Sequence, residues 1–290
     1  MSFAYFPSFR GINNIADLYL RIVGYPYPSR RVEAEIVFDL LRAKPNEKIL
    51  DVGCGEGIFT NYLAKSNRNV WGLDLSERDL SIAKQSAHQL GVRVKYVRSD
   101  AAKMPFARSS FDKVFSISTI EHIGDDQSTF KEIYRVLRPG GTLVFSVPLD
   151  TNPELACWAV SWNQTIKNLL TNSVIASSSS VSEYARKIDK KFNHKRRYTL
   201  ESIRDILRAT GFEVINIRYN PMLFGLIVHN LIHTFRIFEW EKDMKSGYKF
   251  KNRLFLGLIF PLFIVLYEID RILGNLVQFR GFNIIVKARK

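Results

Sequence analysis

Cysteine is scarce in this chain of 290 residues, with Cys54 and Cys157 as the only two. Two isolated cysteines cannot build the disulfide framework of a small secreted domain, and they favour a reducing, cytoplasmic compartment. They do not form a cluster of metal ligands, so we expect no metal site around them. The first residues, MSFAYFPSFR, lack a basic patch followed by an apolar run, so we expect no secretory signal there.

Uninterrupted apolar runs are short as well. The run over 254–267 has 14 uncharged residues and contains Pro261, whereas a bilayer-spanning helix needs about 20 residues. A membrane-spanning helix is therefore not expected. The ordinary share of apolar residues, 46%, excludes a disordered chain and a polytopic membrane protein.

Acidic residues are outnumbered, with 28 Asp and Glu against 42 Lys and Arg, a net charge of +14. The excess is uneven: residues 1–150 carry 20 basic and 17 acidic side chains, whereas 151–290 carry 22 and 11. The second half is thus either generally basic or built to meet an anionic partner such as nucleic acid, acidic lipid or a phosphorylated substrate.

Short apolar strands alternate with amphipathic helices through the first half of the chain. The predicted strands are 48–53, 69–75, 94–100, 111–118 and 142–148, and the predicted helices are 31–43, 57–66, 77–90 and 126–138. The pattern resumes with a helix over 199–210, capped by Thr199 and stopped at Gly211, and with strands over 213–219 and 282–288. This alternation predicts an α/β fold with a doubly wound, mostly parallel sheet.

A glycine-rich loop follows the first strand. ILDVGCGEG places Gly53, Gly55 and Gly57 at a strand-to-helix turn, where missing Cβ atoms let a ligand approach the backbone. The next helix offers free N–H groups to a polar ligand. A lone GxGxG is weak evidence, but its place between a strand and a helix is what the mechanism requires.

Carboxylates stand at the ends of three successive strands. Asp51 precedes the first glycine by two residues, Asp74 ends the second strand and Asp100 ends the third. A carboxylate at the position of Asp74 can accept both ribose hydroxyls of a nucleoside, and Asp100 can meet an adenine amino group. Taken together, the pattern favours a nucleoside-binding site over a generic turn with solvated carboxylates.

The pattern resembles the class I S-adenosylmethionine-dependent methyltransferases, in particular the group that methylates small molecules and lipids. The similarity covers roughly 45–150, 199–219 and 282–288, and it rests on D-V-G-C-G-E-G at 51–57, G-L-D-L-S at 72–76, S-D-A-A-K-M-P-F at 99–106, F-D-K-V at 111–114, E-H-I at 121–123 and R-V-L-R-P-G-G at 135–141. A nicotinamide enzyme, the alternative for the glycine loop alone, prefers GxGxxG.

The resemblance implies a Rossmann-like, seven-stranded sheet and S-adenosylmethionine as cofactor. It implies that Asp51 and the glycine loop hold the methionine moiety, that Asp74 with the following Leu75 holds the ribose, and that Asp100 and Ala101 bracket the adenine. The backbone near Ser118 and Thr119 would line the methyl-donor pocket. The N-methylating Asn/Asp-Pro-Pro-Tyr/Phe signature is replaced by SISTIEH, so N-methylation of adenine, cytosine or glutamine is not expected.

Few catalytic side chains are needed, because methyl transfer from a sulfonium depends mainly on proximity and alignment. His122 is the candidate general base for a hydroxyl acceptor; the alternative is that Glu121 and His122 serve packing beside the cofactor. His194 and Tyr198 are candidate substrate contacts, with a plain structural role as the alternative. His229 and His233 lack a third ligand, so they do not predict a metal site.

The remaining segments suggest additions to this core. We expect an N-terminal helical cover (1–44), the cofactor-binding core (45–150), a lid (151–198), the end of the sheet (199–219 and 282–290) and an apolar helical insertion (220–281). Lys245, Lys249, Lys251 and Arg253 precede the apolar run, and Arg271 and Arg280 follow it. The helices of this insertion either pack against the domain or present an apolar face bordered by cations. Such a face suits an apolar acceptor or peripheral contact with an anionic membrane, such as the inner face of the cell membrane.

The sequence therefore predicts a methyltransferase that acts on oxygen or carbon of an apolar small molecule or lipid. Two alternatives remain: a nucleic-acid methyltransferase that uses the basic half, and a non-catalytic binding protein that retains the cofactor fold. Nucleic acid is disfavoured because the basic residues adjoin aliphatic runs rather than a polar groove with interleaved aromatics.

Overall fold

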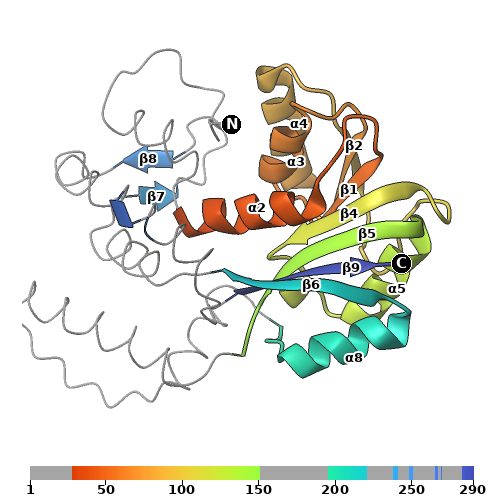
Figure 1. Cartoon of the computed structure of the whole chain (residues 1–290). Helices are drawn as coiled ribbons and strands as arrows, with labels where there is room; N and C mark the ends of the chain where they lie inside the picture. The colour runs from red at the N-terminus through yellow and green to blue at the C-terminus, as the bar shows by residue number, and fades with distance from the viewer. Residues whose placement is uncertain are drawn as a thin grey trace, which may run out of the picture.

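The computed structural model describes residues 28–150, 195–220 and 283–290, together with 238–240, 248–250 and positions 265, 266 and 269 (Figure 1). Predictions for 1–27, 151–194 and most of 221–282 lie outside the described residues. His194, His229, His233 and Cys157 are among them.

A seven-stranded sheet runs through the described residues, in the order β3-β2-β1-β4-β5-β9-β6. Its strands are β1 (Ile49–Val52), β2 (Val70–Asp74), β3 (Lys95–Arg98), β4 (Phe111–Ile117), β5 (Leu137–Pro148), β6 (Glu213–Asn220) and β9 (Asn283–Arg289). The pairs among β1 to β5 are parallel, and β9 runs antiparallel to both β5 and β6. The predicted α/β fold with a mostly parallel seven-stranded sheet is confirmed.

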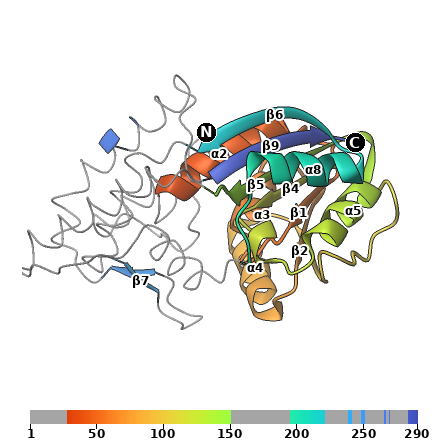
Figure 2. The same ribbon diagram turned by 90° about the horizontal axis from the view of Figure 1, so that it is seen from below.

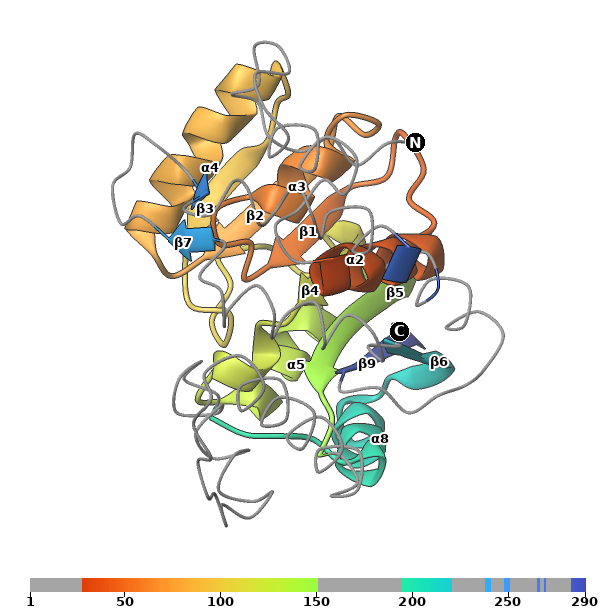
Figure 3. The same cartoon turned by 90° about the vertical axis from the view of Figure 1, so that its left-hand side faces the viewer.

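Helices cover both faces of this sheet. They are α2 (Pro28–Leu41), α3 (Ile58–Leu63), α4 (Glu77–Leu90), α5 (Asp126–Val136) and α8 (Leu200–Thr210), with a 3-10 turn, η1, at Ile120–His122. Figure 3 shows α2, α3 and α4 on one face and α5 and α8 on the other, and Figure 2 shows α2 and α8 on opposite sides of β6 and β9.

The helix ends follow local side-chain chemistry. Ser76 begins α4 by accepting a hydrogen bond from the Asp79 N–H, and Gly91 ends it in a left-handed conformation with φ 66°. Thr199 and Ser202 form a reciprocal capping box at the start of α8, and Gly211 with φ 96° ends that helix. The predicted cap at Thr199 and the predicted stop at Gly211 are confirmed.

The boundary between α5 and β5 differs from the prediction. The helix predicted over 126–138 ends at Val136, and β5 begins at Leu137. Leu137 is already extended, with φ −70° and ψ 141°. A proline also disfavours helical geometry at the residue before it, here Arg138. The Pro-Gly-Gly segment therefore lies within the strand, where Gly140 N donates to Lys290 O at 2.9 Å.

A second, two-stranded antiparallel sheet joins β7 (Phe238–Trp240) and β8 (Tyr248–Phe250). Both strands fall within 220–281, where an apolar helical insertion was expected, and β8 lies in the polar-basic stretch between its two apolar runs. Each of the two segments carries two aromatic residues, which favour strands.

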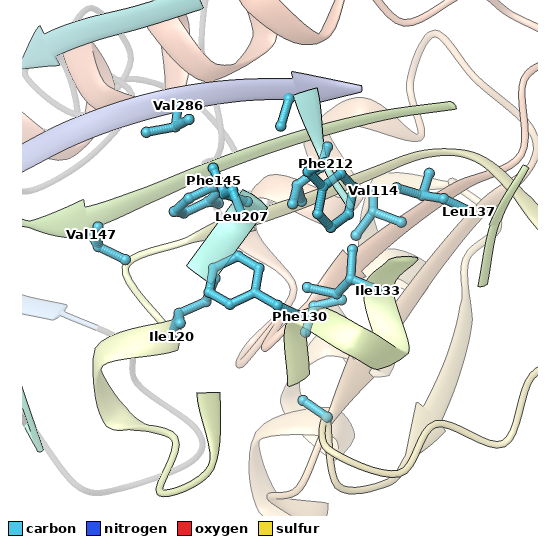
Figure 4. Packing of buried hydrophobic residues seen from close by; sticks show 14 of the residues in the cluster. Val114, Ile120, Phe130, Ile133, Leu137, Phe145, Val147, Leu207, Phe212 and Val286 are labelled. Carbon is cyan, nitrogen blue, oxygen red and sulfur yellow. The ribbon is translucent and has the colours of Figure 1, made fainter. Parts of the chain in front are cut away.

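Apolar side chains fill the space on each side of the sheet. Figure 4 shows the cluster under α5 and α8, where Phe130, Phe145 and Leu207 meet. Val37, Phe115 and Ile285 belong to the cluster on the α2 side. Burying a side chain of this size stabilises the fold by about 1.5–3 kcal/mol. The packing on both faces therefore fixes the positions of the parallel strands and of their carboxyl ends.

Candidate functional site

A pocket of about 1020 Å³ lies at the carboxyl ends of β1, β2 and β4. It is lined by the loops that leave these strands, where ligands bind in open α/β sheets. The lining residues are Gly53, Cys54, Gly55, Glu56, Ile58, Phe59, Leu73, Asp74, Leu75, Ser76, Asp79, Ser99, Asp100, Ala101, Ala102, Ile117, Ser118, Thr119, His122, Ile123, Gly124 and Asp125.

The glycine loop owes its composition to two different needs. Gly53 and Gly57 have φ values of 74° and 75°, and a Cβ at either position would collide with the protein itself. At Gly53 the Cβ would lie 1.9 Å from Thr119 Cγ2, and at Gly57 it would lie 2.3 Å from Tyr96 Oη. Gly55, with φ 49°, has no heavy atom within 4 Å of a built Cβ. Of the three, Gly55 presents open backbone to a ligand.

Asp74 is held in place by backbone donors. Its Oδ2 accepts from Gly55 N at 2.8 Å and its Oδ1 accepts from Ser76 N at 2.9 Å. Each carboxylate oxygen can accept further hydrogen bonds, so both remain able to receive ribose hydroxyls. The glycine loop and the carboxylate are thereby fixed to each other before any ligand binds.

Asp51 lies beneath the loop, 3% exposed, and is absent from the pocket wall. Burial raises its pKa to about 7; the Thr60 hydroxyl, which donates to Oδ2 at 2.6 Å, opposes the shift, and the nearby Asp74 charge adds to it. Direct ligand contact was expected for Asp51 and Gly57, but both stand behind the wall, because β1 and α3 enclose them. Both residues support the glycine loop from inside the fold.

The pocket is acidic although the chain is basic. Among the described residues that line it, five carry carboxylates and none is Lys or Arg; the acids are Glu56, Asp74, Asp79, Asp100 and Asp125. Burial and the charge of Asp79 raise the pKa of Glu56, and Arg78 opposes this shift. Such a wall favours a cationic ligand, which S-adenosylmethionine is by virtue of its sulfonium. The size, open backbone and charge of the pocket fit this cofactor.

The far side of the pocket is formed by the chain that follows β4. Ser118 takes φ 48°, uncommon for a residue with a side chain, and Thr119 Oγ1 donates to Gly53 O at 3.1 Å. His122 is 36% exposed in its side chain, and its Nε2 lies 3.9 Å from Oε1 of the buried Glu121. His122 is thus a titratable side chain in the pocket wall with a carboxylate nearby.

Nine of the twelve predicted contact residues that the structure describes come together in this wall. They are Gly53, Gly55, Asp74, Leu75, Asp100, Ala101, Ser118, Thr119 and His122. Asp51 and Gly57 lie behind it, as described above. Tyr198 is also outside the wall: it is 3% exposed and donates to Asp126 Oδ2 at 2.8 Å. Its buried hydroxyl supports the loop that follows β4 rather than facing the cavity.

Sequence reasoning missed three acids of the wall, Glu56, Asp79 and Asp125. All three follow the carboxyl end of a parallel strand, and this position was the available signal. Isolated acids in helix starts are also common solvated caps, and Asp125 does cap α5 by accepting from Ser128 N at 2.9 Å. Residue type alone could not separate the two roles.

The described residues contain no group of three or more His, Cys, Asp or Glu placed to hold a metal ion. No helix in the described part of the chain is long and apolar enough to cross a membrane.

The sheet order, the glycine loop and the acid-lined pocket have the arrangement expected of the class I S-adenosylmethionine-dependent methyltransferase fold. Residues 50–145 match the protein family described as "Methyltransferase domain". This match spans the glycine loop, Asp74, Asp100 and the segment after β4, so the resemblance inferred from the sequence is confirmed.

Known relatives agree on the domain. The ubiquinone biosynthesis O-methyltransferase of Hahella chejuensis is 33% identical over 129 residues, which cover 44% of this chain and 54% of that protein. The chain thus spans about half the length of this curated relative. The phosphoethanolamine N-methyltransferase 2 of Haemonchus contortus, solved with S-adenosyl-L-methionine, superposes with a TM-score of 0.59 at 22% identity, covering 100% of this chain and 60% of that one.

The same fold also occurs in the cyclase SpnF, with a TM-score of 0.56 at 18% identity over 91% of this chain and 81% of that one. A likeness of this kind shows the fold alone. Proteins that share this fold can differ in the reaction that they carry out, because the reaction depends on the residues of the site.

Proposed function

We propose that this chain transfers a methyl group from S-adenosylmethionine to oxygen or carbon of an apolar small molecule or lipid. The observation that carries the proposal is the acid-lined pocket at the carboxyl ends of β1, β2 and β4, with Asp74 oriented by the glycine loop. The similarity of the domain to a ubiquinone biosynthesis O-methyltransferase supports a small-molecule acceptor.

Each part of the wall has a role in this proposal. Asp74 accepts the ribose hydroxyls, Asp100 and Ala101 bracket the adenine, and Leu75, 65% exposed, adds apolar surface at the rim. Gly53 and Gly55, supported from behind by Asp51 and Gly57, hold the methionine moiety. The cofactor supplies an activated methyl group, and the protein supplies alignment and exclusion of water.

His122 is proposed as the general base for an oxygen acceptor. Its ring lines the pocket, and the Glu121 carboxylate at 3.9 Å stabilises the imidazolium that forms when the ring takes the hydroxyl proton. A carbon acceptor activated in another way would not need this base. His194 remains a proposed substrate contact by its position in the sequence, and for Tyr198 we propose a supporting role.

The decisive experiment has two stages. Calorimetry of the full chain with S-adenosylmethionine measures binding, and we expect saturable binding to the wild type. Methyl-labelled cofactor is then incubated with a lipid extract, with a phenolic quinone precursor and with RNA and DNA. Label in the lipid or phenol supports the proposal; label in nucleic acid, or no binding of the cofactor at all, overturns it.

Asp74→Ala serves as the loss-of-binding variant for this experiment. Removing the ribose acceptor should weaken S-adenosylmethionine binding by about 1–3 kcal/mol, as measured by calorimetry. Glu77→Ala is the matched control, because this nearby carboxylate is absent from the pocket wall. Its carboxylate forms an exposed ion pair with Arg98 at 4.0 Å. Equal affinities of the two variants would refute the assignment of Asp74.

We also propose peripheral contact of the chain with an anionic membrane, on the cytoplasmic side. The support is the basic excess of residues 151–290 beside apolar runs. Flotation with vesicles of phosphatidylglycerol should carry the protein, and vesicles of phosphatidylcholine should not. Tight heparin retention without flotation on either vesicle would favour nucleic acid instead.

A further inference from the structure

A buried carboxyl group connects helix α2 to the wall of the pocket. Glu33 lies on α2 and is 1% exposed. Its Oε1 accepts two hydrogen bonds, from Ser118 Oγ at 2.9 Å and from Asn283 Nδ2 at 2.8 Å. The Glu33 side chain thus joins α2 to the end of β4 and to the start of β9. Ser118 is 85 residues and Asn283 is 250 residues from Glu33 along the chain.

Ser118 is the point where this link meets the pocket. Its φ of 48° is a left-handed conformation that costs a residue with a Cβ roughly 1–2 kcal/mol, so the surroundings must hold it. Ser118 N donates to Ser146 Oγ at 3.0 Å, and the Ser118 hydroxyl donates to Glu33. The turn is therefore fixed from both its backbone and its side chain.

The fixed turn sets the position of Thr119. Thr119 Oγ1 donates to Gly53 O at 3.1 Å, and Thr119 Cγ2 occupies the space that a Cβ on Gly53 would need. A change in Ser118 would therefore move the contact between the segment after β4 and the glycine loop. Both segments line the pocket.

We propose that Glu33 is a positioning residue of the S-adenosylmethionine pocket, acting through Ser118 and Thr119 on the glycine loop. This inference rests on the proposed function for its ligand. Glu33 itself is absent from the pocket wall, and it acts by holding the left-handed turn at Ser118.

Three variants of the full chain test the role of Glu33. Glu33→Ala removes the link; Glu33→Gln keeps a carbonyl oxygen that can accept the same two hydrogen bonds. Asn283→Ala removes the hydrogen bond from Asn283 to Glu33 and leaves the bond from Ser118 in place. Calorimetry with S-adenosylmethionine and hydrogen exchange of the Ser118 amide without ligand are the two measurements.

We expect Glu33→Ala to weaken binding about tenfold and to speed exchange of the Ser118 amide by a similar factor. Glu33→Gln and Asn283→Ala should stay within about twofold of the wild type in both measurements, even where Asn283→Ala lowers the melting temperature. In a Ser118→Ala background, Glu33→Ala should have no further effect on affinity.

A purely structural role for Glu33 gives a different result. Equal losses in Glu33→Ala and Asn283→Ala, or a loss of stability with unchanged affinity and unchanged exchange at Ser118, would overturn the inference. If the wild type does not bind S-adenosylmethionine, the proposed function fails, and the exchange measurement alone still decides whether Glu33 holds the turn.

Discussion

At the scale of single residues, Gly53 and Gly55 share a positive φ but differ in their surroundings. A Cβ on Gly53 meets Thr119 at 1.9 Å, and a Cβ on Gly55 meets nothing within 4 Å. The sequence could not distinguish the two glycines, because only the folded chain brings Thr119, which follows β4, against Gly53 and leaves the space beside Gly55 open. Both glycines line the pocket, but only Gly53 is also required by the packing of the protein itself.

We expect Gly53→Ala to fold poorly, because the collision with Thr119 adds about 1–3 kcal/mol to the strain of a positive φ. Gly55→Ala should cost only the strain, about 1–2 kcal/mol, but should weaken S-adenosylmethionine binding because the methyl group occupies open space in the pocket. Thermal unfolding and calorimetry measure the two effects. A well-folded Gly53→Ala, or a Gly55→Ala that binds like the wild type, would contradict this division.

Asp51 gives the stability of the protein a pH dependence. Its pKa is 3.8 when exposed and about 7 in the fold, so between these values the folded state holds more protons than the unfolded state. The free energy of unfolding therefore falls as pH rises from about 4 to 7, by roughly 2–4 kcal/mol at about 1.4 kcal/mol per pKa unit.

Asp51→Asn should remove this contribution, so the stability of the variant relative to the wild type should rise between pH 4 and pH 8. Urea unfolding at the two pH values measures the difference. Asp205→Asn, a change at a largely exposed carboxylate on α8, is the control and should track the wild type at both. A constant gap between Asp51→Asn and the wild type would show that Asp51 does not titrate differently in the fold.

At the scale of elements, the sequence located most helices and strands because local chemistry decides them. Ser76, Gly91, Thr199 and Gly211 act on neighbours within a few residues, and their signals can be read from one segment. The strand at Leu137 and the link from Glu33 to Ser118 could not be read in this way. They depend on partners elsewhere in the chain, such as Phe111 beside Leu137.

The capping box of α8 offers a test at this scale. Thr199→Ala should lower the free energy of unfolding by about 1 kcal/mol, because the Ser202 N–H loses its acceptor. Thr210→Ala in the same helix is the matched control, since its hydroxyl only donates to Ile206 O one turn earlier at 2.7 Å. Both variants should bind S-adenosylmethionine like the wild type; a loss of affinity in Thr199→Ala would show that α8 influences the pocket.

At the scale of the whole molecule, the acidic side chains of the pocket contrast with the basic excess of the chain. The chain carries +14, yet the described wall of the pocket has five carboxylates and no Lys or Arg. Composition alone left two interpretations open, a generally basic chain or one that meets an anionic partner, and the described wall of the pocket contains none of the basic surplus. The basic surplus must act elsewhere on the chain.

This contrast predicts how salt affects the two forms of the cofactor. Raising the salt concentration from about 0.05 to 0.5 M should weaken binding of the sulfonium cofactor severalfold, because screening reduces its attraction to the acids. Binding of the uncharged thioether product should change less. Calorimetry at the two concentrations gives the four affinities, and equal salt dependence of both ligands would mean that the acids do not act on the sulfonium.

The antiparallel strand β9 has a consequence for biosynthesis. Residues 283–289 lie between β5 and β6, and in the described sheet β6 pairs only with β9. On the ribosome, β6 and its helix α8 emerge some sixty residues before the strand that joins them to the rest of the sheet. During that interval the nascent chain carries unpaired strand edges, on which chaperones act. Completion of the fold is therefore an event that follows translation of the last described strand.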